Sequence, residues 1–128
     1  MKDKLIELFK NSYAPYSNFQ VAAVLVCKDG TEFKGVNVEN ASYGGCICAE
    51  RSAIVSAVSN GYKKGDFKEL YVMCNSENIG EPCFICRQVF VEFFDKDMPV
   101  TCMNPKGESI VYTVAELCPH PFDSEDLE

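Results

Sequence analysis

Two short cysteine-containing segments constrain this chain more than any other feature. Cys48-Ala49-Glu50 begins one apolar run, and Pro82-Cys83-Phe84-Ile85-Cys86 begins another. Three cysteines, two of them in a C-x-x-C pair, are enough to bind a zinc ion and to leave its fourth position open to water. A carboxylate two residues after the first cysteine is well placed to exchange protons with that water. The chain between the two segments has room for a helix, a loop and a strand, so the fold must bring them together.

The composition is typical of one soluble globular domain. At 128 residues, with 47% hydrophobic and 24% charged residues, the chain can build a single core of two or three layers. We therefore expect one domain over residues 1–128, ending in an acidic, solvated tail over 123–128. The formal net charge is −7. Because an acidic surface repels phosphate backbones, we expect no nucleic-acid partner.

The cysteine content and the apolar runs predict a cytoplasmic protein with no membrane contact. No stretch approaches the roughly 20 apolar residues that span a bilayer. Glu7 interrupts the first apolar run, and no small-residue cleavage site follows it, so we expect no signal peptide. Outside the two motifs, the cysteines lie in or beside predicted elements or apolar runs, where cysteine behaves as a small buried hydrophobe. These are Cys27, Cys46, Cys74, Cys102 and Cys118. A reducing compartment suits this pattern.

The apolar patterns predict an α/β fold with the order α-β-β-α-β-α-β-β. Helices are expected over 2–12, 48–60, 83–94 and, briefly, 113–117, and strands over 19–27, 32–38, 69–74, 99–103 and 109–113. Short turns at Asp29-Gly30 and at 104–107 make their flanking strands antiparallel. The helix over 48–60 is apolar on nearly every side, which predicts burial between layers. The expected architecture is a three-layer α-β-α fold with a mixed five-stranded sheet.

Both cysteine segments then begin helices, which favours thiolates. Helix N-termini present unpaired N–H groups and a partial positive charge. Three thiolates around Zn²⁺ leave a local charge of about −1, which weakens the metal as a Lewis acid. Arg51, directly after Glu50, and Arg87, directly after Cys86, are the candidates to supply positive charge around the ligands.

Other interpretations of the same residues stay open. A C-x-x-C pair also suits a structural zinc site or a redox pair. A structural site needs a fourth protein ligand, for which Cys46 and His120 are the nearest candidates. Glu50 alone is also compatible with an ordinary first-turn carboxylate. Its place beside Cys48 favours proton transfer.

The chain resembles the small, homotetrameric zinc-dependent cytidine deaminases from Tyr16-Ser17-Asn18-Phe19 to the segment 117–122. The most specific matches are the run 37–44, Cys48-Ala49-Glu50-Arg51 and Cys86-Arg87-Gln88. Cysteine or histidine followed by x-Glu, with P-C-x-x-C further on, is typical of zinc-dependent nucleobase deaminases. The resemblance implies one zinc ion per chain and hydrolytic deamination of cytidine and deoxycytidine. The products would be uridine or deoxyuridine and ammonia, as in pyrimidine salvage.

The resemblance also implies residue roles. Cys48, Cys83 and Cys86 would bind zinc, Arg51 would hydrogen-bond to their sulfurs, and Glu50 would be the catalytic proton shuttle. Asn37 and Glu39 would bind the ribose hydroxyls, and Phe19 would line the nucleoside pocket. The Ala49 N–H would meet the base carbonyl, and Phe122 would stack on the base from a neighbouring subunit. An amide and a carboxylate two apart at a strand end do point the same way. Loop capping by this pair, a core position for Phe19 and a C-terminal anchor at Phe122 are the simpler alternatives.

The apolar stretches and three departures from the family pattern bear on assembly and substrate choice. The apolar stretches 47–58 and 89–94 exceed what one sheet face needs, which favours a homotetramer with shared active sites. Phe84 stands where the family usually has glycine, so its ring must point away or narrow the pocket; Glu81 and Ala22 replace a common serine and a common glycine. Blasticidin S deamination, or that of another aminopyrimidine nucleoside, is therefore an alternative. A non-catalytic zinc-stabilised binding module is the alternative from another class, and the intact motif argues against it.

Overall fold

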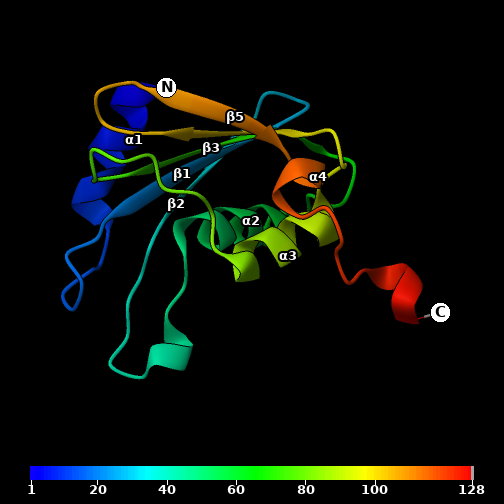
Figure 1. Ribbon diagram of the computed structural model, residues 1–128, viewed down its shortest axis with the longest axis horizontal. Coiled ribbons are helices and arrows are strands. Elements are labelled where there is room, and N and C mark those ends of the chain that lie inside the picture. Colours follow the sequence, from blue (N-terminus) through cyan, green and yellow to red (C-terminus); the bar gives the residue numbers. More distant parts are fainter. Residues whose placement is uncertain (128) are drawn as a thin grey trace.

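The structure is a computed structural model that describes residues 1–127 (Figure 1). Five strands form one mixed sheet in the order β2-β1-β3-β4-β5. β3 and β4 are parallel and the other pairs are antiparallel, since α3 provides the crossover that a parallel pair requires. The strands are β1 (Val21–Cys27), β2 (Glu32–Val36), β3 (Phe67–Cys74), β4 (Pro99–Met103) and β5 (Ser109–Thr113). The predicted α/β class with a mixed five-stranded sheet is confirmed.

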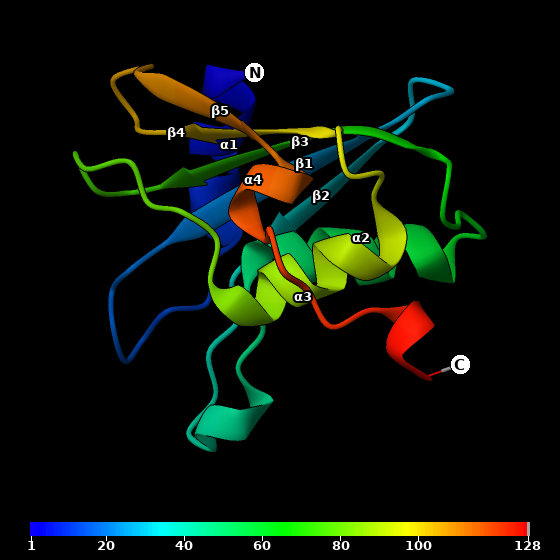
Figure 2. The ribbon, with the colours of Figure 1, turned by 45° about the vertical axis from the view of Figure 1, so that its right-hand side comes forward.

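Helices cover both faces of this sheet (Figures 1 and 2). They are α1 (Lys2–Leu8), α2 (Ala49–Ser59), α3 (Phe84–Phe93) and α4 (Val114–Leu117). Alternate residues of β1 supply the two cores, because successive side chains of a strand point to opposite faces. Ala23 and Leu25 belong to the large core with α2 and α3, whereas Ala22 and Val24 pack with Leu5 of α1. The predicted three-layer arrangement is confirmed.

Close packing of β2 against α2 fixes the start of that helix. A Cβ atom at Gly35 would lie 2.2 Å from the Ala49 carbonyl oxygen and 2.6 Å from the Ala53 nitrogen. Only glycine permits this approach of strand to helix. The first turn of α2, which carries Glu50, is therefore held directly over the sheet.

The element bounds differ from the predictions mainly at their ends. α1 stops at Leu8 and continues as a 3₁₀ turn over Phe9–Asn11, and β1 begins at Val21 instead of residue 19. α2 and α3 each begin one residue later than predicted, because Cys48 and Cys83 are their N-cap residues. The predicted burial of α2 between layers is wrong for the single chain, where α2 is an outer helix and Val55 is 54% and Val58 40% exposed.

All eight cysteines are free, and four of them, Cys27, Cys74, Cys86 and Cys102, are buried. Over residues 1–127, no helix is both long and apolar enough to cross a membrane. The acidic tail ends in an exposed 3₁₀ turn over Ser124–Leu127, and residue 128 lies outside the described part.

Candidate active site

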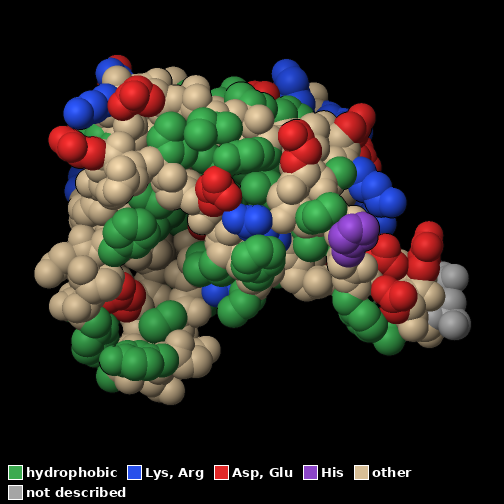
Figure 3. Space-filling view, viewed as in Figure 1, with side chains coloured by type: hydrophobic (Ala, Val, Ile, Leu, Met, Phe, Trp, Pro, Cys, Tyr) green, Lys and Arg blue, Asp and Glu red, His purple; other side chains and the backbone are tan. Residues whose placement is uncertain are grey.

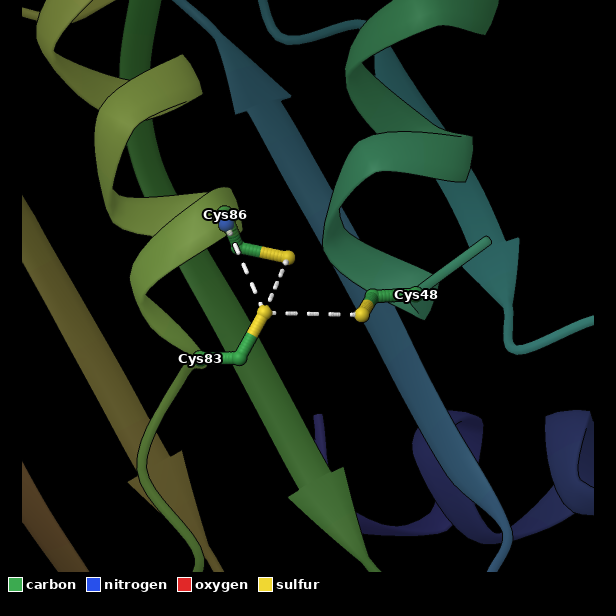
Figure 4. A group of neighbouring side chains, drawn as sticks. All are labelled: Cys48, Cys83 and Cys86. Atoms are coloured by element: carbon green, nitrogen blue, oxygen red, sulfur yellow. Dashed lines mark hydrogen bonds between the residues drawn. The ribbon is translucent and has the colours of Figure 1, made fainter. Parts of the chain in front are cut away.

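The N-termini of α2 and α3 bring three sulfur atoms together (Figure 4). The Cys48 Sγ lies 3.7 Å from the Cys83 Sγ, which lies 3.6 Å from the Cys86 Sγ. The Cys83 Sγ also accepts a hydrogen bond from the Cys86 backbone N–H at 3.5 Å and so caps α3. Around a tetrahedral zinc ion with bonds of about 2.3 Å, sulfur ligands are about 3.8 Å apart. The three sulfurs thus already have the spacing of ligands to one zinc ion.

Neither candidate for a fourth protein ligand joins this group. In the described chain, the cluster with metal-ligand spacing contains Cys48, Cys83 and Cys86 alone. The Cys46 Sγ instead accepts a hydrogen bond from the Asn40 N–H at 3.3 Å, and His120 is exposed in the C-terminal segment. Three protein ligands with an open fourth position are typical of catalytic zinc and not of structural zinc.

A cavity of about 510 Å³ opens at the triad. Its lining includes Cys48, Glu50 and Cys83 together with Phe19, Asn37 and Glu39. Figure 3 shows the surface hollowed between the body of the molecule and the protruding segment that contains the 3₁₀ turn Tyr43–Gly45. The fold therefore places the metal-binding group and three of the predicted substrate contacts at one cavity.

Comparison with known proteins agrees with this geometry. The family model of the cytidine and deoxycytidylate deaminase zinc-binding region matches residues 1–102. Cytidine deaminase of Sporosarcina psychrophila is 45% identical over 118 residues, which are 92% of this chain and 85% of that protein. The chain belongs to the cytidine deaminase family. Cytidine deaminase of Halalkalibacterium halodurans is 41% identical over 122 residues, 95% of this chain and 91% of that protein.

A solved member of the family has the same fold. The crystal structure of cytidine deaminase from Burkholderia pseudomallei matches with a TM-score of 0.86 and 43% sequence identity. The match covers 95% of this chain and 99% of the other. Within this cytidine deaminase fold, Cys48, Cys83 and Cys86 are the zinc-binding triad.

Arg51 supports the thiolate form of the first zinc ligand. Its Nη2 donates a hydrogen bond to the Cys48 Sγ at 3.4 Å. The neighbouring Cys86 thiol, together with the Arg51 guanidinium, lowers the pKa of Cys48 well below its usual range. This environment favours the Cys48 thiolate, which is the form that binds a metal ion.

Glu50 is a buried carboxyl group at the cavity. Only 4% of the Glu50 surface is exposed to solvent. Burial is the main cause that raises the pKa of Glu50 to about 7, and the nearby Cys48 thiolate acts in the same direction. A group with a pKa near neutrality can accept and return a proton at low cost. This environment suits the proton shuttle expected from the sequence.

Glu39 is held by three donors from one short turn. Its Oε1 accepts hydrogen bonds from the backbone N–H groups of Tyr16 at 3.0 Å and Ser17 at 3.2 Å, and its Oε2 accepts one from the Ser17 hydroxyl. The hydroxyl contact is the main cause that lowers the pKa of Glu39, and both N–H groups add to it. Glu39 is thus an oriented carboxylate at the cavity wall.

The side chain of Asn37 stabilises the same cavity wall through hydrogen bonds. Its Oδ1 accepts hydrogen bonds from the Ser12 hydroxyl and from the Val21 N–H at 2.9 Å, and its Nδ2 donates to the Phe19 carbonyl at 2.7 Å. These bonds tie the chain just before β1 to the end of β2. The simpler interpretation of loop capping and the predicted contact with substrate are therefore compatible at this residue.

The remaining predicted residues, Ala49, Phe122 and Arg87, lie outside the cavity lining of their own chain. Within the described chain, Ala49 and Phe122 do not line the cavity: Ala49 is fully buried, and Phe122 is 59% exposed. The Phe122 carbonyl accepts a hydrogen bond from the Gln88 side chain at 2.6 Å. Arg87 hydrogen-bonds to the carbonyls of Pro82 at 2.7 Å and Leu117 at 3.0 Å. The direct contact with a ligand sulfur is made by Arg51.

Phe84 and Glu81, which depart from the family pattern at the second motif, differ in their position relative to the cavity. Phe84 is 73% exposed, and its ring centroid lies 4.4 Å from the guanidinium carbon of Arg87. The ring therefore points away from the cavity and does not narrow it. Glu81 does line the cavity, where the Tyr112 hydroxyl at 2.8 Å and the Arg87 Nη2 at 3.3 Å hold its carboxylate.

The sequence analysis assigned no role to Ser17 or Tyr112, whose hydroxyl groups hydrogen-bond to the cavity residues Glu39 and Glu81. A signal existed for Ser17. A serine two residues before an aromatic residue can accept that residue's N–H and form a local turn. The Ser17 Oγ does accept the Phe19 N–H, at 3.0 Å. For Tyr112, on β5 and distant in sequence from Glu81, no local pattern was available.

Proposed function

We propose that this protein hydrolytically deaminates cytidine and deoxycytidine to uridine and deoxyuridine. The observation that carries the proposal is one cavity that holds a three-cysteine zinc site, a buried Glu50, and the Asn37–Glu39 pair. Membership of the cytidine deaminase family supports the same reaction.

In this reaction Glu50 moves the protons. Cys48, Cys83 and Cys86 would hold the zinc ion, which would supply a Lewis acid that lowers the pKa of a water molecule. Glu50 accepts a proton from that water as its oxygen adds to C4 of the base, and delivers the proton to ring N3. It then takes the second proton from the hydroxyl group added at C4 and passes it to the amino group, so that the C4–N bond breaks, the C4 carbonyl forms and ammonia leaves. Arg51 offsets part of the thiolate charge through its contact with Cys48.

The hydrogen bonds of Asn37 and Glu39 support both sugars as substrates. A carboxylate has about four acceptor positions, of which Glu39 uses two on Oε1 and one on Oε2. Asn37 has both acceptor positions and one of its two amide hydrogens engaged. The pair therefore has one acceptor position on Glu39 and one donor on Asn37 left. These are enough for one substrate hydroxyl group, which would donate to Glu39 and accept from Asn37. Cytidine and deoxycytidine share the 3′-hydroxyl, which we assign to this role.

The charge of the cavity favours a nucleoside over a nucleotide. Its charged lining consists of Glu39, Glu50, Glu81 and Arg51, and Arg51 is engaged with sulfur. Among the described residues, no lysine lines the cavity. A 5′-phosphate would therefore meet an acidic wall, whereas an uncharged sugar would not.

A substrate panel tests the activity. Purified, zinc-loaded protein should change the ultraviolet absorbance of cytidine and deoxycytidine as they become uridine and deoxyuridine, with cytidine 5′-phosphate turned over far more slowly. Preference for blasticidin S would favour the alternative substrate. No change with any of these compounds would leave the non-catalytic zinc module as the better interpretation.

We also propose that the working form is a cytoplasmic homotetramer with shared active sites. Apolar side chains of α2 and α3 (Val55, Val58 and Ile85) are exposed in the single chain, and Phe122 lies outside its own cavity. Eight free cysteines suit a reducing compartment. Light scattering should give about four times the chain mass of 14.3 kDa; a mass near one chain would exclude the assembly. Truncation after Leu117 should weaken nucleoside binding if Phe122 completes a neighbouring site.

A further inference from the structure

We propose that Ser17 is a positioning residue, which aims the Glu39 carboxylate at the sugar of the nucleoside and ties it to the Phe19 wall of the cavity. The inference rests on the proposed function, because it concerns the same cavity. It assigns a role to a residue whose side chain does not itself need to touch the zinc ion or the base.

Ser17 contacts both oxygens of the Glu39 carboxylate. Its hydroxyl donates to Oε2, and its backbone N–H donates to Oε1 at 3.2 Å. The same hydroxyl oxygen accepts the Phe19 N–H at 3.0 Å. One side chain therefore links the carboxylate to the backbone of the aromatic residue on the same cavity wall.

The backbone around Ser17 is shaped for this contact. The Asn18 N–H donates to the Ala14 carbonyl at 3.0 Å, which closes a turn, and Asn18 has a φ of +58°. Asparagine tolerates this left-handed conformation better than most residues do. Asn75, just after β3, donates its side-chain N–H to the Asn18 carbonyl at 3.1 Å. The turn is thus fastened to the sheet, and two consecutive N–H groups face the carboxylate.

The position of the hydroxyl determines what Glu39 can offer to a ligand. With both acceptor positions of Oε1 occupied, the free position lies on Oε2, the oxygen that the Ser17 hydroxyl holds. Without that hydroxyl, the carboxylate keeps its two bonds to backbone but loses the contact that orients Oε2. We expect loss of a hydrogen bond to a charged group to weaken nucleoside binding about tenfold.

The test compares Ser17→Ala with Ser17→Thr, which keeps the hydroxyl. Ser76→Ala is the matched control, because the Ser76 hydroxyl also accepts the N–H two residues on, from Asn78 at 3.2 Å, outside the cavity. Ser17→Ala should raise KM for cytidine about tenfold with kcat nearly unchanged, whereas Ser17→Thr and Ser76→Ala should keep KM within about twofold. Zinc content and the midpoint of thermal unfolding should match between the two alanine variants.

Two further measurements separate positioning from a structural effect. In a Glu39→Gln background, Ser17→Ala should add little, since the two changes act on one interaction. With 3′-deoxycytidine, which lacks the assigned hydroxyl, wild type and Ser17→Ala should have the same KM. Equal KM for cytidine in wild type and Ser17→Ala, or an equal penalty with both compounds, would overturn the inference.

Calorimetric binding of uridine distinguishes failure of this inference from failure of the proposed function. If the wild type shows no turnover but binds uridine more tightly than Ser17→Ala does, the positioning role stands and the activity is wrong. If turnover is normal but both proteins bind uridine equally, the activity stands and the positioning role is wrong.

Discussion

The Arg51 guanidinium lies 3.4 Å from the Cys48 sulfur, three residues away on the first turn of α2. This contact places the positive charge directly on a zinc ligand, beside the buried Glu50. It acts on both groups in the same sense, because a nearby cation favours ionised sulfur and ionised carboxylate. The spacing from Cys48 to Arg51 on one helix is therefore a means of tuning the site without contact with substrate.

Removal of this charge should move the pH dependence of activity. The Arg51 charge lowers the pKa of Glu50, which must be ionised to accept a proton. In Arg51→Gln, the acid limb of kcat/KM should therefore move to higher pH. Arg51→Lys, which keeps a charge, should move it less. An unchanged acid limb in Arg51→Gln would show that the contact does not influence the titrating group.

Glu50→Gln should separate proton transfer from metal binding. The amide cannot accept the proton, so kcat should fall by about 10²- to 10⁴-fold. Zinc should stay near one ion per chain, because the metal-binding cluster does not include Glu50. Steady-state kinetics and metal analysis of the same preparation measure both. Loss of zinc in this variant would make Glu50 a ligand and contradict the mechanism.

Glu50 should also make the zinc-free protein less stable as the pH rises. Burial raises the pKa of this carboxyl from 4.5 to about 7, so the folded state holds a proton that the unfolded state releases. The related stability is complete below about pH 4.5 and is lost as the pH rises through about 7. The shift corresponds to about 3 kcal/mol in the free energy of unfolding.

Urea unfolding of chelated protein checks this linkage. From pH 5 to pH 8, wild type should lose stability relative to Glu50→Gln, whose amide does not titrate. If the difference in free energy of unfolding between the two proteins does not change with pH, the buried Glu50 carboxyl does not titrate with a raised pKa.

Loss of one thiolate should abolish stoichiometric zinc binding. In Cys83→Ala only two ligands are left, and because metal binding is coupled to folding the midpoint of thermal unfolding should fall as well. Cys46→Ala is the matched control, since the Cys46 sulfur hydrogen-bonds to Asn40 and lies outside the metal-binding cluster. Zinc loss in Cys46→Ala would mean that the site has a fourth protein ligand.

Phe84→Ala should leave the affinity for cytidine unchanged. The ring is exposed and stacks on Arg87 outside the cavity, so its removal should keep KM within about twofold and cost about 0.5–1 kcal/mol of stability. Phe19→Ala, at a residue that lines the cavity, should raise KM clearly. Steady-state kinetics with both variants would detect a role of Phe84 in the pocket through a matching rise in KM.

Local patterns determined the secondary structure and the chemistry of the metal site. Their spacing made Cys48, Cys83 and Cys86 candidate zinc ligands, and turn residues with alternating apolar residues predicted β4 and β5 with their observed bounds. These features depend on neighbours in the chain, because a helix cap, a hairpin turn and a C-x-x-C pair are each complete within a few residues.

Only the tertiary structure decided what surrounds each of these groups. The sulfurs meet because β2 packs tightly on α2 at Gly35, while α3 crosses between β3 and β4. The burial of Glu50 and the hydrogen bond from Ser17 to Glu39 depend on chain segments that are distant in sequence. The sequence placed an amide and a carboxylate at a strand end, but it did not show which acceptor positions the fold would occupy. Side-chain direction and desolvation arise from packing, which no local pattern contains.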